Sequence, residues 1–118
     1  MGRFASAILA TLATAPASAQ SYDCTLTQIC IATDCADAAM AVPLTIDGDG
    51  ALMGPPDEAM VLRAVPLDAT ARRAFVAEDG HDVFFATLGE TLEFVMTSHL
   101  VNPAYRYAVT TGQCQEAR

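Results

Sequence analysis

The sequence predicts a mostly β domain, a small antiparallel barrel or sandwich of about 7–8 strands that ends in a meander. The first observation is that apolar and polar residues alternate in short segments separated by glycine, proline and aspartate. The second is that the turn signals Asp79-Gly80, Gly89-Glu90 and Asn102-Pro103 join the last four segments, which should therefore be antiparallel neighbours. The third is an even number of cysteines, 4 in 118 residues, which indicates a disulfide-stabilised domain.

The N-terminal half supplies four expected strands, at residues 22–31, 42–47, 51–53 and 60–65. The first alternates, with one face made of Cys24, Leu26, Gln28 and Cys30, and the second alternates about Leu44 and Ile46. A Gly-Asp-Gly turn then reverses the chain into the third strand. That strand ends at two prolines, because proline cannot donate to a ladder. The fourth is an apolar run that ends at the next proline.

The C-terminal half supplies four more expected strands, at residues 72–78, 82–88, 91–98 and 104–111. Adjacent apolar residues form the centre of the first two, and the last two alternate clearly. We expect the apolar faces of these strands to form the core, made of Leu92, Phe94, Met96, Val83, Phe85 and the face of Tyr105 and Tyr107. The alternative is an α+β fold, with short helices at residues 36–40 and 69–73.

Residues 1–19 have the composition of a cleavable secretory signal, with one arginine, an uncharged apolar segment at residues 4–15 and small residues before the cleavage site. The apolar segment is shorter than the roughly 20 residues that a membrane-spanning helix needs. We therefore expect cleavage between Ala19 and Gln20 and localisation in the periplasm or outside the cell. The mature chain would be a single disulfide-stabilised β domain, residues 20–118, without a membrane span.

The charge of the expected mature chain limits its partners. Outside residues 1–19 there are 5 arginines, no lysine and 14 acidic residues, which gives a net charge of −9. Nucleic acids and anionic membranes are poor partners for such a chain, because phosphate binding needs clustered lysine and arginine. The charge favours solubility and permits a basic protein partner through electrostatic steering.

The cysteines are expected to form two structural disulfides in an oxidising compartment. Four cysteines allow three pairings, and we favour Cys30–Cys35, which closes a tight loop, together with Cys24–Cys114. Their spacing lacks the close ligand pairs of a zinc ribbon and the Cys-x-x-Cys of redox catalysts. We therefore expect no metal and no cofactor.

Two other patterns are typical of metal sites, and each has a simpler interpretation. Residues 47–50, Asp-Gly-Asp-Gly, begin like a calcium loop that Glu58 would close. However, Ala51 and Leu52 stand where a ligand and a glycine belong, so we expect a plain turn. Methionine and histidine can bind copper, but the methionines after residue 19 are isolated from one another and are expected to fill the core.

A catalytic site has little support in the sequence. A small hydrolase could be built from His81, Asp82 and His99 with Ser98 near them, but no nucleophile elbow or oxyanion motif accompanies these residues. We therefore expect no catalytic residues and keep the hydrolase as a remote alternative.

The expected function is a non-catalytic binding or interaction domain, with Tyr105, Arg106 and Tyr107 as candidate interface residues. The alternative is an acidic inhibitor of a basic envelope enzyme such as lysozyme. In its small size, export, acidity and the placement of Cys24 and Cys114 near the two ends of the domain, the chain resembles periplasmic lysozyme inhibitors. That resemblance implies a small β-barrel with a basic protein as its partner.

Overall fold

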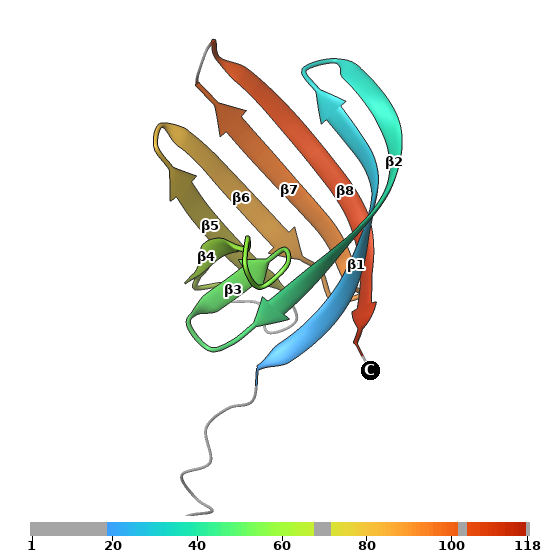
Figure 1. The fold of residues 1–118 in the computed structure, drawn as a ribbon, viewed down its shortest axis with the longest axis vertical. Coiled ribbons are helices and arrows are strands. Elements are labelled where there is room, and N and C mark those ends of the chain that lie inside the picture. The colour runs from blue at the N-terminus through green and yellow to red at the C-terminus, as the bar shows by residue number, and fades with distance from the viewer. Residues whose placement is uncertain (1–18, 68–71, 102–103, 118) are drawn as a thin grey trace, which may run out of the picture.

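The computed structural model describes residues 19–67, 72–101 and 104–117, and within them eight antiparallel strands form a closed barrel (Figure 1). The prediction of a mostly β antiparallel domain is confirmed, and of the two predicted architectures, barrel and sandwich, the structure is the barrel. Each strand pairs with the next along the chain, and β1 pairs with β8 to close the barrel. The strands are β1 (Gln20–Ile31), β2 (Asp34–Ile46), β3 (Gly50–Met53), β4 (Met60–Val65), β5 (Arg73–Asp79), β6 (Asp82–Leu88), β7 (Glu93–Leu100) and β8 (Arg106–Glu116).

Most of the expected secretory signal, residues 1–18, lies outside the described residues. Within the described ranges, no helix is long and apolar enough to cross a membrane.

The α+β alternative is wrong, because the described residues contain no helix. Residues 36–40 belong to β2, which starts at Asp34 and not at residue 42 as expected. The two-residue turn Ala32-Thr33 brings Ile31 opposite Asp34, and β2 then pairs with β1 down to Ile46. This ladder outweighs the weak strand preference of alanine and aspartate. Of the second expected helix, residues 69–71 lie outside the described residues and Arg73 begins β5.

The core lies inside the barrel and is made of inward-facing apolar residues: Tyr22, Cys24, Leu26, Leu44, Ile46, Ala51, Leu62, Phe75, Ala77, Ala86, Leu88, Phe94 and Cys114. Phe94 was predicted there, and Leu92 and Met96 pack against this cluster. The other predicted core residues are on the surface: Val83, Phe85, Tyr105 and Tyr107 are exposed.

The register explains this correction. On β6, Leu88 and Ala86 lie opposite Phe94 and Met96 of β7, so the even-numbered residues of β6 face inward. Phe84 therefore takes the inward position that was expected for its two neighbours. On β8, buried Thr110 and Cys114 fix the inward face in the same way, so Tyr107 points outward.

The expected common face of Cys24, Leu26, Gln28 and Cys30 is also wrong, because β1 has a register shift between Leu26 and Gln28. Cys24 and Leu26 are buried before the shift. After it, Cys30 lies opposite Val109 on the outward face of β8. The shift therefore places the two disulfides on different sides of the barrel wall.

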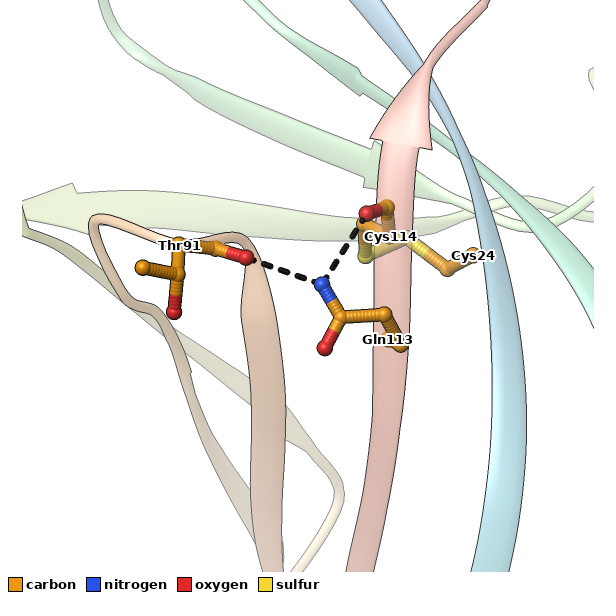
Figure 2. The surroundings of a disulfide bond; sticks show 4 residues. All are labelled: Cys24, Thr91, Gln113 and Cys114. Atoms are coloured by element: carbon orange, nitrogen blue, oxygen red, sulfur yellow. Dashed lines mark hydrogen bonds between the residues drawn. A yellow bond between two sulfur atoms is a disulfide. The ribbon is translucent and has the colours of Figure 1, made fainter.

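The structure contains two disulfides, Cys24–Cys114 and Cys30–Cys35, and no free cysteine among the described residues. Figure 2 shows that Cys24–Cys114 joins the adjacent strands β1 and β8, and both cysteines are buried. Beside it, the Gln113 side-chain Nε2 donates to the carbonyl oxygens of Thr91, at 2.8 Å, and Cys114, at 3.3 Å. Two disulfides indicate an oxidising, extracytoplasmic environment.

Gly112 of β8 allows these two strands to approach each other. A Cβ atom at this position would collide with the backbone carbonyl oxygen of Thr25 on β1. The contact favours a residue without a side chain at this point of the barrel seam.

Candidate interaction surface

The outward side of β6, β7 and β8 carries two cross-strand rows of side chains. Val83, His99 and Tyr107 lie opposite one another in the first row. The second row lies two residues away from the first on each strand and is made of Phe85, Thr97 and Val109. We call these six residues, together with Tyr105 from the adjoining turn, the β6–β8 outer face.

This face contains no Asp, Glu, Lys or Arg, although the chain carries 14 acidic residues, and its most exposed side chains are aromatic or aliphatic. The exposed fractions are 38% for Val83, 40% for Phe85, 42% for Tyr107 and 64% for Tyr105. Exposed aromatic and aliphatic side chains that adjoin one another mark interaction sites more often than single exposed residues do. Tyrosine in particular is enriched in the residues that dominate binding energy.

Two polar contacts involve the described residues on either side of the β7–β8 connection, Val101 and Tyr105. His99 Nδ1 lies 3.1 Å from the Tyr105 hydroxyl oxygen, and the centroids of the two rings are 6.2 Å apart. The backbone N–H of Val101 donates to Asp82 Oδ1 at 2.8 Å. Since the contact with His99 restrains the Tyr105 side chain before a partner arrives, less side-chain entropy is lost on binding.

The three predicted interface residues do not lie on one face. Tyr105 and Tyr107 belong to the β6–β8 outer face, whereas Arg106 lies opposite Leu100 and therefore points to the other side of the wall. The sequence reasoning missed Val83 and Phe85 as surface residues. The sequence contained a signal for this assignment, because Phe84, Ala86 and Leu88 are spaced two residues apart and share one face of the strand. Phe85 belongs to the other face.

The residues of the remote hydrolase alternative are not brought together on one surface. Ser98 is buried inside the barrel, while His99, the next residue of β7, points outward. Asp82 accepts the Val101 hydrogen bond described above, and His81 is exposed in the β5–β6 turn. An attacking serine hydroxyl and this histidine would therefore lie on opposite sides of the strand.

The Asp-Gly-Asp-Gly segment forms a turn. One carboxylate oxygen of Asp47 accepts the backbone N–H groups of Asp49, at 2.9 Å, and Gly50, at 3.1 Å. This is the hydrogen-bonding pattern by which aspartate stabilises turns without a metal. Among the described residues, no group of three or more His, Cys, Asp or Glu side chains could hold a metal ion.

The methionines after residue 19 differ in burial. Met53 and Met60 lie opposite each other on β3 and β4, and both pack against the core, as does Met96. Met40 of β2, in contrast, is 51% exposed, so it does not fill the core as expected.

A cleft of about 410 Å³ lies between the start of β4 and the end of β5. The β4–β5 ladder has only three residue pairs, from Val65↔Ala74 to Arg63↔Val76, and the cleft lies beyond them. Met60, Ala77 and Phe84 supply apolar lining, and three acidic residues add negative charge, namely Glu58, Glu78 and Asp79. This combination suits an amphipathic cation such as a lysine or arginine side chain.

A second cavity, of about 500 Å³, lies at the opposite end of β5 and β6 and reaches Phe85 of the outer face. Its polar lining includes Arg72, Arg73 and Glu93. The hydroxyl of Thr91 donates to Glu93 at 2.7 Å, and this hydrogen bond is the main cause that lowers the pKa of the Glu93 carboxyl.

Comparison of the chain with protein-family models, curated proteins and solved structures gives no match. The fold and the surface together define a disulfide-stabilised antiparallel β-barrel with an exposed apolar outer face.

Proposed function

We propose that this protein is a non-catalytic binding domain that recognises a partner protein through the β6–β8 outer face. The observation that carries the proposal is the register, which places Val83 and Phe85 of β6 and Tyr107 of β8 on the same exposed face, with β7 between them. A face of this composition gains free energy when a partner removes it from water, at roughly 25 cal/mol per Å² of apolar area. The barrel supplies a rigid support, so little ordering is needed on binding.

The proposed setting is the periplasm or the extracellular space, after cleavage between Ala19 and Gln20. The two disulfides support an extracytoplasmic location, and the composition of residues 1–19 supports the signal. N-terminal sequencing of the protein purified from its own cells tests the cleavage site. A chain that still begins at Met1 would contradict it.

The experiment for the binding role compares two surface variants of the exported protein. Phe85→Ser with Tyr107→Ser removes the two largest outward side chains of the strands in the patch. Leu52→Ser on β3 is the control, because Leu52 is 43% exposed and lies outside both candidate surfaces. Each is immobilised with both disulfides intact and incubated with envelope extract from its own cells. We expect a protein that is retained by the wild type and by Leu52→Ser and lost by the double variant. Equal retention by the double variant contradicts the proposal.

A second candidate function, the inhibition of a basic envelope enzyme such as lysozyme, is favoured by the acidic cleft between β4 and β5. A basic side chain of the enzyme would enter the cleft and meet Glu78 and Asp79. The test is a cell-wall lysis assay at low and high salt, with Glu78→Gln and Asp79→Asn combined in one variant. Inhibition that weakens with salt and with the variant supports this candidate, and unchanged lysis at micromolar protein contradicts it.

A further inference from the structure

β2 has one side without a strand neighbour over most of its length. On one side it pairs with β1 from Asp34 to Ile46, along the whole strand. On the other side it pairs with β3 only from Leu44 to Ile46, and the Pro43 carbonyl accepts one more hydrogen bond, from Gly54 N–H. In Figure 1 the rest of β2 extends well beyond the short strands β3 and β4. No described strand pairs with this side of residues 34–42, which we call the free edge.

Within residues 34–42 the free edge contains no lysine and no proline, and no described strand covers it. Natural sheets cover their edges or place lysine, proline or inward charges on them. Here most side chains of residues 34–42 are exposed, and four of the nine are alanines, which leave the backbone accessible. One register shift interrupts the pairing with β1 between Asp37 and Met40. Residues 40–42, on the C-terminal side of this shift, pair regularly with β1.

The alternation of an antiparallel strand identifies which backbone groups point outward. The Pro43 carbonyl points away from β1, because it bonds Gly54. Residues two apart point the same way, so the N–H and C=O of Ala41 also point away from β1, toward the free edge. A strand laid against this edge would find a donor and an acceptor at Ala41.

The charge favours one kind of occupant. Asp34 and Asp37 are exposed on this segment, and the whole chain carries a net charge of −8. A second copy would bring the same negative charge to the edge, whereas a segment with lysine or arginine would be attracted. The Cys30–Cys35 disulfide joins β1 and β2 next to their turn, so the edge is held in its extended form before binding.

We propose that an extended, basic segment of a partner polypeptide adds to the free edge of β2 as a further strand of the sheet. Backbone hydrogen bonds at Ala41 and beyond supply affinity, and Asp34 and Asp37 select lysine or arginine in the segment. This site is separate from the β6–β8 outer face and uses different residues, so the two proposals can fail independently.

The test selects binders from a library of random peptides of about ten residues, long enough to span the free edge. The target is the exported protein with both disulfides intact, and the affinities of the selected peptides are then measured in solution. The decisive variant is Ala41→Pro, which removes the outward donor. The ladder between β1 and β2 should survive this substitution, because the backbone nitrogen of residue 41 points away from β1. A proline already occupies the equivalent position opposite Asp23, at residue 43. Ala41→Val keeps the N–H group and is the matched control.

We expect basic peptides that lose at least about tenfold in affinity with Ala41→Pro and less than about twofold with Ala41→Val. Should Ala41→Pro unfold, amide hydrogen exchange of the wild type replaces it, and the peptide should slow exchange at Ala41. Peptides that are not basic, that bind Ala41→Pro as tightly, or that leave Ala41 exchange unchanged overturn the proposal. So does a selection without binders. Dimerisation of the wild type that Ala41→Pro abolishes would assign the edge to a second copy and also overturn it.

Discussion

Removal of the Cys24–Cys114 disulfide should destabilise the barrel far more than removal of Cys30–Cys35. The sequence separations are 90 and 5, so the loops that the bonds close in the unfolded chain differ greatly in length. In the loop-entropy model, closed loops of about 91 and about 6 residues stabilise by about 4.6 and about 2.2 kcal/mol. Cys24 and Cys114 are also buried in the core, so their truncation to alanine adds a packing loss.

The assay is equilibrium unfolding in urea, followed by circular dichroism, for the double variants C24A/C114A and C30A/C35A. Each removes two sulfur atoms, so each controls for the chemistry of the other. We expect the first to lose at least about 2.4 kcal/mol more than the second, because the packing loss adds to the difference in loop entropy. This is a large part of the roughly 5–15 kcal/mol typical of such domains. Equal losses, or a larger loss for C30A/C35A, would refute the reasoning, because β1 and β8 would then already be in contact in the unfolded chain.

Three further results are expected. Phe94→Ala empties a buried core position and should cost about 3–5 kcal/mol in the same urea assay. Gly112→Ala should lower the melting temperature because its Cβ meets the backbone of β1, whereas Gly48→Ala, with nothing within 4 Å, should be neutral. Thr91→Val should raise the pKa of Glu93, measured by NMR titration of its side chain. Since the folded pKa of Glu93 is lowered, its stabilising effect is present above the unfolded pKa and is lost as pH falls through the folded pKa.

Strand positions could be predicted where turn residues delimit them. β4 and β6 have the predicted bounds, because Pro66 ends the first and the Asp79-Gly80 turn precedes the second. The first eight residues of β2 could not be predicted, since alanine and aspartate have low strand preference. They form a strand because β1 lies beside them, and that contact becomes visible only when the register is known.

The surface was harder to predict than the fold. Three apolar residues in succession, 83–85, give no parity of their own, so the register with β7 decides which of them faces inward. On β8 the alternation was recognised but the inward face was assigned wrongly. Cys114 was a usable signal, because its bond to Cys24 turns it toward the core. Thr110 then faces the core as well, since it lies an even number of residues from Cys114, and Tyr107 faces outward.

The two disulfides therefore stabilise different parts of the molecule. Cys24–Cys114 lies in the core at the β1–β8 seam, while Cys30–Cys35 lies at the end of the β1–β2 hairpin, on the outward face after the register shift. Loss of the second bond leaves the seam and the core contacts unchanged, so the barrel should remain folded. The hairpin end would then fray, because few buried side chains hold residues 34–41 in place. If the free edge of β2 binds a partner strand, a reductant that reaches only this exposed bond should weaken binding before it unfolds the barrel.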